Sequence, residues 1–199
     1  MRSMLLAGFV AFTAIAATSV SPASAQTTGG IVITHGGGNL NVAKGPLSEA
    51  DQSATTLGGI AGRHGVAITN GGNNRNFATG PLSFAGQDTT TVGGTAFGRG
   101  RVITNGGNNN NFARGFGSTA TQSTLTLGGT AFGGGRSVTN GGFNTNLAAG
   151  KFSSADQQVV TLGGTAGRRG LNVVSGGANK NAALGFGSSA SQQVFTSAQ

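Results

Sequence analysis

The sequence predicts an all-β fold, a β-solenoid built from five 35-residue Gly/Asn-rich repeats with uncapped ends. The first observation behind this prediction is a period of 35 residues that runs from Ile31 to the C-terminus without insertion or deletion. The second is that fixed and variable positions alternate along each repeat, which is typical of a strand with two unlike faces. The third is composition, because the Gly, Asn, Thr and Ser of the repeats are poor helix formers.

Residues 1–25 have the three parts of a secretory signal peptide. Arg2 supplies the positive charge, residues 4–17 form the apolar stretch, and small residues at 23–25 precede a cleavage point. The apolar stretch is shorter than the roughly 20 residues that a transmembrane helix needs, so we expect no membrane span. The mature, secreted chain is therefore predicted to begin with a short lead at 26–30.

The five repeats carry the same residue at many positions, and the constant positions lie on one face of the predicted strands. The repeats span 31–65, 66–100, 101–135, 136–170 and 171–199. We expect the constant polar residues to point inward and to carry self-assembly, with the Asn and Gln amides hydrogen-bonding their equivalents about 4.8 Å away in the next copy. These inward ladder residues are Asn39, Asn74, Asn109, Asn144, Asn179, Asn41, Asn76, Asn111, Asn146, Asn181, Ser48, Ser83, Ser118, Ser153, Ser188, Gln52, Gln87, Gln122, Gln157 and Gln192.

Glycines divide each repeat into short segments. The pairs at 36–37 and 58–59 and their equivalents are expected to be turns. They leave up to four extended segments per repeat, for example 101–105, 109–114, 117–127 and 130–132. The motif T-x-G-G occurs twice in each of the first four repeats, for example at Thr34 and Thr56, so one rung and two rungs per repeat both remain open.

The ends of the repeat region resemble its middle. The first and last copies keep the ladder residues, and only the lead at 26–30 precedes the first copy in the predicted mature chain. Solenoids that stay monomeric need atypical terminal repeats to cover their strand edges. Head-to-tail stacking that does not close produces a filament, which is the expected assembly. The alternative is a stand-alone solenoid whose ends are frayed or covered by a partner.

The motifs N-x-A, at 41–43, 76–78 and 111–113, and S-x-A-x-Q, with paired glycines, resemble the curlin repeat of curli, the secreted amyloid fibres of Gram-negative biofilms. The curlin repeat is shorter, orders its Ser, Gln and Asn differently, and follows an export-targeting segment. The resemblance implies a fibre subunit at the cell surface of a Gram-negative bacterium, for biofilm matrix, adhesion and aggregation. Its implied partners are further copies of itself, a nucleator subunit and an outer-membrane export channel.

The residues that catalysis and metal binding require are scarce. The chain has four carboxylates and no Cys, and no acidic pair recurs in the repeats. The two histidines, His35 and His64, also occur once each at their repeat positions. General acid–base chemistry and a thiolate site therefore lack their residues, and we expect no enzyme, no metal and no cofactor.

Arginines gather near one glycine corner of the repeats: Arg63, Arg99, Arg101, Arg136, Arg168 and Arg169. One interpretation is contact with a polyanion, such as an anionic polysaccharide, lipopolysaccharide or extracellular DNA. The other is that these charges keep an aggregation-prone edge soluble during export.

Two further functional hypotheses stand beside the fibre subunit. An ice-binding solenoid is suggested by the threonines at 89–91 and 124–126, although an ice-binding surface would need such a ladder on every rung. A monomeric adhesin that binds polysaccharide would need an aromatic platform and end caps, and neither is visible in the sequence.

Overall fold

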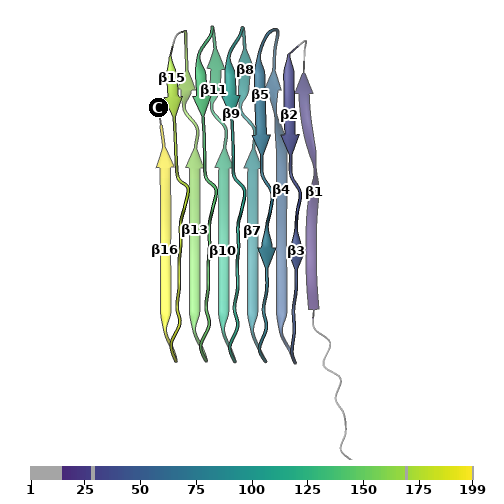
Figure 1. The fold of residues 1–199 in the computed structure, drawn as a ribbon, viewed down its shortest axis with the longest axis vertical. Helices are drawn as coiled ribbons and strands as arrows, with labels where there is room; N and C mark the ends of the chain where they lie inside the picture. Colours follow the sequence, from purple (N-terminus) through teal and green to yellow (C-terminus); the bar gives the residue numbers. More distant parts are fainter. Residues whose placement is uncertain (1–14, 28–29, 169, 199) are drawn as a thin grey trace, which may run out of the picture.

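The computed structural model describes residues 15–27, 30–168 and 170–198. It confirms an all-β parallel β-solenoid of about five turns, with no helix in the described residues and hence none that could cross a membrane. Neighbouring coils pair at an offset of 35 residues, as Gln87 does with Gln122 and Gln122 with Gln157. One repeat therefore makes one rung, and Figure 1 shows the coils lying side by side.

The longer strands form one layer, which we call the long-strand sheet, and its neighbouring strands run parallel to each other. Its long strands are β4 (Glu49–Ala61), β7 (Phe84–Val92), β10 (Thr119–Leu127), β13 (Ser154–Leu162) and β16 (Ser189–Ser197). Beyond a glycine pair the same sheet continues in β8 (Thr95–Phe97), β11 (Thr130–Phe132) and β14 (Thr165–Ala166).

The chain then turns and runs back in a second layer, the return sheet, in the opposite direction (Figure 1). The strands of the return sheet are β2 (Ile31–His35), β5 (Val66–Asn70), β9 (Arg101–Ile103), β12 (Arg136–Val138) and β15 (Leu171–Val173). A small additional sheet joins β3 (Leu40–Asn41) to β6 (Arg75–Asn76). Each coil thus consists of one path with a long strand and one return path whose strands are shorter.

The Asn-rich stretch of the return path is less regular than predicted. The segment expected as a strand at 109–114 and its equivalents in the next two coils form isolated bridges instead: Asn110 with Thr145, Thr145 with Lys180, and Ala148 with Ala183. One residue earlier in this path, a left-handed backbone bends the chain, with φ of 67° at Asn108 and 67° at Phe143. This bend separates the strands of the return sheet from the Asn-rich stretch that follows.

Small side chains fill the space between the two layers. One cluster of buried alanines comes from both layers: Ala50, Ala78, Ala85, Ala113, Ala120, Ala148, Ala155 and Ala183. A second cluster comes from the end of β4 and from the strands that flank the next turn: Ala61, Ala67, Ala96, Val102, Ala131 and Ala166. Because these side chains are short, the two sheets can approach closely, and the remaining interior consists of amide and hydroxyl groups.

The paired glycines serve close packing as well as turning. A Cβ on Gly106 would lie 2.5 Å from Thr91 Oγ1 and 2.8 Å from Thr126 Oγ1 across the interior. On the opposite layer, a Cβ on Gly128 would collide with Thr104 Oγ1. In the first coil β4 runs unbroken through residues 58–59, so the turn predicted there is wrong. Gly59 is needed for space, because a Cβ there would collide with the carbonyl oxygen of Gly94 in the next coil.

Large apolar side chains lie on the outside of the solenoid. Phe77 and Phe112 stack in adjacent coils with ring centroids 4.9 Å apart and an interplanar angle of 5°. Phe152 and Phe186 lie in the turns that precede β13 and β16, where their rings meet edge to face. They are 57% and 80% exposed. Burial of large side chains therefore contributes little to this core, and backbone and amide hydrogen bonds carry much of its specificity.

A strand precedes the first repeat, where sequence reasoning expected no cap. β1 (Ile15–Thr27) pairs in parallel with β4 from Ile15 opposite Glu49 to Thr27 opposite Ala61. Most of β1 belongs to the predicted signal segment 1–25. The outer edge of the first coil is thus covered while that segment is attached, and cleavage after Ala25 would remove most of the cover.

Candidate self-assembly site

A ladder of glutamine amides runs through all five coils inside the long-strand sheet. Gln52 Nε2 donates to Gln87 Oε1 at 2.7 Å, and Gln87 Nε2 donates to Gln122 Oε1 at 2.8 Å. The same bond continues to Gln157 and then to Gln192, each at 2.7 Å. Gln122 is 3% exposed, so each coil buries an amide that only its neighbours can satisfy.

Two asparagine ladders run through the return path. In the first, Nδ2 of each residue donates to Oδ1 of the next at 2.8, 2.6, 2.5 and 2.6 Å, through Asn39, Asn74, Asn109, Asn144 and Asn179. In the second, the distances are 3.1, 2.8, 2.7 and 2.9 Å, through Asn41, Asn76, Asn111, Asn146 and Asn181. The side-chain amides of these three ladders point into the solenoid, as the alternation of fixed and variable positions along each repeat predicts.

The serine positions bind differently from the amides. Ser118 Oγ donates to the carbonyl oxygen of Gly150 in the next coil and accepts from the backbone N–H of Gly115 at 3.1 Å. The carbonyl partner is the equivalent glycine of the next coil for Ser48, Ser83 and Ser153. A hydroxyl is too short to span one rung to its own equivalent easily, and only Ser188 and Ser153 are in direct contact among these serines, at 3.3 Å.

The three amide ladders share one polarity. Each amide nitrogen donates toward the coil with the higher residue number, and each oxygen accepts from the coil below it. The first coil consequently presents oxygens, and Gln52 Oε1 is buried without a hydrogen-bond partner. The last coil presents nitrogens. This polarity has no signal in the sequence, because Asn and Gln each carry a donor and an acceptor.

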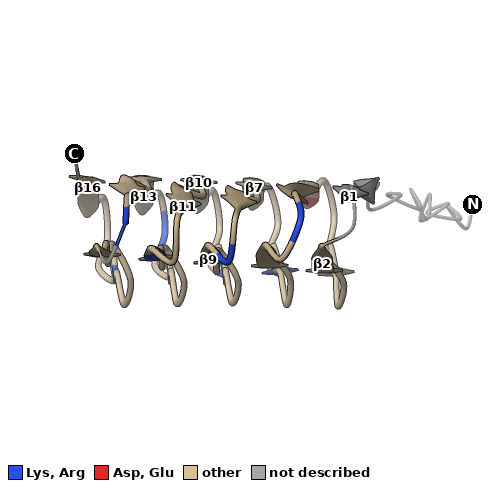
Figure 2. Cartoon of the chain, turned by 90° about the horizontal axis from the view of Figure 1, so that it is seen from above, with Lys and Arg blue, Asp and Glu red and all other residues tan. Residues whose placement is uncertain are grey.

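The described members of the predicted arginine group lie along the row of turns that joins the long-strand sheet to the return sheet, which we call the arginine edge. Arg63, Arg99 and Arg168 are exposed in the turns from the long-strand sheet to the return sheet. Arg101 and Arg136 are exposed, begin β9 and β12, and stand directly opposite each other in register. Figure 2 shows Lys and Arg on the segments that join the layers. Arg169 lies outside the described residues.

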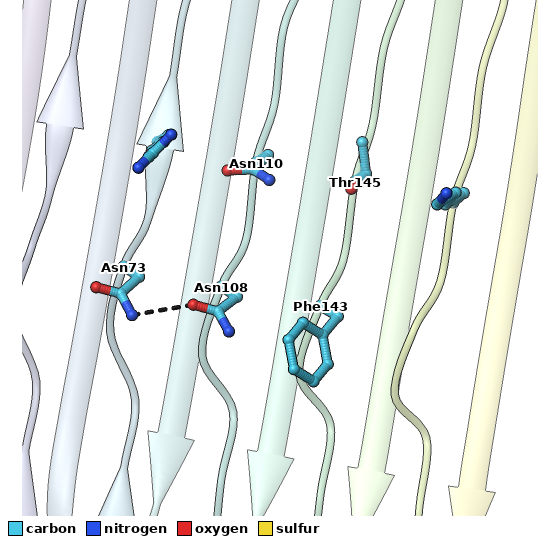
Figure 3. Close-up of a pocket in the computed structure, with 7 residues that line it drawn as sticks. Asn73, Asn108, Asn110, Phe143 and Thr145 are labelled. Atoms are coloured by element: carbon cyan, nitrogen blue, oxygen red, sulfur yellow. Dashed lines mark hydrogen bonds between the residues drawn. The ribbon is translucent and has the colours of Figure 1, made fainter.

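A shallow groove crosses the outer surface of the return path, and sequence reasoning missed it because variable positions line it. Figure 3 shows Asn73, Asn108, Asn110, Phe143 and Thr145 around this groove of about 560 Å³. Asn73 Nδ2 donates to Asn108 Oδ1 at 2.9 Å, and Phe143 is 57% exposed. Arg75 and Lys180 complete the lining, so the groove combines amides, one ring and two cations.

Four of the five threonines behind the ice-binding alternative point into the protein, and Thr90 alternates to the outer face. Thr89, Thr91, Thr124 and Thr126 are at most 3% exposed. Thr89 Oγ1 donates to Asn109 Oδ1 at 3.1 Å. An ice-binding surface needs exposed threonines, and these are enclosed between the two layers.

The four carboxylates, those of Glu49, Asp51, Asp88 and Asp156, are exposed on the outer face of the long-strand sheet. Asp156 accepts from Thr121 Oγ1 at 2.8 Å. Within the described residues, no three His, Asp or Glu side chains gather closely enough to hold a metal ion.

Comparisons with protein-family models, with curated proteins and with solved structures found no match for this chain.

Proposed function

We propose that this chain is a secreted structural subunit that assembles head to tail into curli-like amyloid fibres of a bacterial extracellular matrix. In the proposal, the subunit leaves the cell through an outer-membrane channel and begins to polymerise on a nucleator subunit. It has no catalytic role. The function of the fibre is adhesion and cell aggregation. The curlin-like motifs N-x-A and S-x-A-x-Q, present in each coil, support the choice of fibre type.

The observation that carries the proposal is the common polarity of the amide ladders. The last coil offers amide nitrogens, and the first coil offers a buried amide oxygen on Gln52. These two surfaces are complementary and lie at opposite ends of one molecule, so their contact generates an open filament. A second copy placed one rung beyond β16 would continue every ladder without a change of residue type.

Assembly is tested directly on the mature chain 26–199. We expect micromolar solutions to become sedimentable and to bind thioflavin within days, and dried fibres to give a meridional reflection near ~4.7 Å. A heat-denatured sample held in strong denaturant serves as the non-assembling control. A chain that stays monomeric in buffer over the same time would rule out the fibre proposal.

Polyanion binding by the arginine edge is a separate prediction. The double variant Arg101→Gln/Arg136→Gln should weaken binding of the fibres to double-stranded DNA and lower the salt dependence, because two stacked cations are lost. The matched control is Arg75→Gln/Lys180→Gln, which removes the same charge from the groove on the return path. Equal losses in both variants would show that net charge, and not the arginine edge, determines binding.

A further inference from the structure

The lower end of the glutamine ladder contains an unsatisfied group. Gln52 is 1% exposed, and its Oε1 has no hydrogen-bond partner. In each later coil the equivalent oxygen accepts from the glutamine below it, at 2.7 to 2.8 Å. Burying a carbonyl oxygen without a hydrogen bond is unfavourable. A neighbouring strand that donates a hydrogen bond to this oxygen would therefore bind the edge of β4 better than β1 does.

The neighbour now present, β1, matches β4 poorly. Its register places Thr18 opposite Gln52, where every other coil has a glutamine. The pairing is offset by 34 residues instead of 35, and it shifts twice between Ser21 and Gln26. Pro22 lies at the first shift and has no N–H to donate to the ladder. An edge strand with a proline and a bulge is also a poor template for a further strand.

The last coil of a second copy matches the same edge better. β16 carries Ala190, Gln192 and Thr196 at the repeat positions of Ala50, Gln52 and Thr56. Within the described residues β16 pairs only with β13, and Gln192 receives a bond from Gln157 without passing one on. Placed on β4 at the 35-residue offset, Gln192 would donate to the unsatisfied oxygen of Gln52.

We propose that β1 is a removable cap on the surface where the last coil of a second copy binds. The inference rests on the proposed fibre function and identifies the contact as β16 of one copy on β4 of the next. While residues 15–25 are attached, this edge is occupied and the chain adds no subunit there. Cleavage after Ala25 leaves only two residues of β1 on the chain and opens the edge. Cleavage after Ala25 thus determines when, as well as where, a further subunit can bind and the fibre can grow.

The test uses sheared fibres of the mature chain 26–199 as seeds and measures elongation with fresh mature chain. A synthetic peptide of residues 15–27 should slow elongation in a dose-dependent manner, and a scrambled peptide of the same composition should not. The peptide carrying Thr18→Gln supplies the missing amide, so it should inhibit at a roughly five- to tenfold lower concentration, the factor expected for one net hydrogen bond.

The uncut chain 1–199 provides a second measurement. It has a free β16 edge and a covered β4 edge, so small amounts should add to seeds and then stop growth, which shortens the fibres. If the uncut chain elongates seeds as fast as the mature chain, or if the scrambled and native peptides act alike, the cap is refuted while the fibre function stands. Failure of the mature chain to form any fibre would instead refute the fibre function.

Discussion

Replacing Gln157 with Met should lower the free energy of unfolding by about 2–5 kcal/mol, because two amide groups lose their partners inside the solenoid. Gln157 accepts from Gln122 Nε2 and donates to Gln192 Oε1, each at 2.7 Å, and is 1% exposed. Methionine has a similar length and fills the same space, so the loss reports the hydrogen bonds and not a cavity. Chemical denaturation of the freshly prepared monomeric chain provides the measurement.

The neighbouring residue on the same strand is a matched control. Gln158 is exposed on the outer face of β13, so Gln158→Met should change the unfolding free energy by no more than about 0.5 kcal/mol. Both variants have the same composition and differ only in the face of the sheet that they alter. Equal effects of the two substitutions would mean that the ladder contributes nothing specific to stability.

Replacing Gly129 with Ala should have a still larger effect, above about 4 kcal/mol. A Cβ at this position would collide with the carbonyl oxygen of Gly164 in the next coil and lie 2.5 Å from Ser137 Oγ. Because the obstacle is backbone, no side-chain rotation relieves it, and the third and fourth coils must separate locally. Far-ultraviolet circular dichroism and the denaturation midpoint of the monomeric chain would show this loss.

Gly37 provides the opposite case. A Cβ there would meet no heavy atom within 4 Å, and its backbone is not among the left-handed positions. Gly37→Ala should therefore be neutral or stabilising by up to about 1 kcal/mol, since alanine restricts the unfolded chain. If both alanine variants are equally stable, close approach is not the reason for the conserved spacing of glycines between the repeats.

The parts of this structure that follow from the sequence are those that depend on period and alternation. The 35-residue repeat predicts the stacking of coils, and alternation predicts that Gln122 and Asn111 are buried while Thr119 faces outward. Both features follow from the geometry of a strand, in which neighbouring side chains point to opposite faces. They need no knowledge of the rest of the fold.

Most of the structural features that the sequence did not predict depend on contacts between the two layers. Composition cannot distinguish a glycine that permits a turn from Gly128, which makes room for a threonine across the interior. The left-handed backbone at Phe143 has no glycine signal, since this residue type rarely adopts that conformation. The pairing of β1 with β4 was also not predicted, because a segment with the pattern of a signal peptide is interpreted as a targeting sequence and left out of the fold.

The fixed offset between coils also constrains how such a gene can change. In a parallel stack, the insertion of one residue in a long strand would turn every following side chain of that strand to the wrong face. Gln157 would then point to solvent, and the ladder through Gln122 and Gln192 would be broken. The long strands can therefore tolerate no insertion, and natural variants should differ in the number of whole 35-residue coils or in the length of the turns between strands.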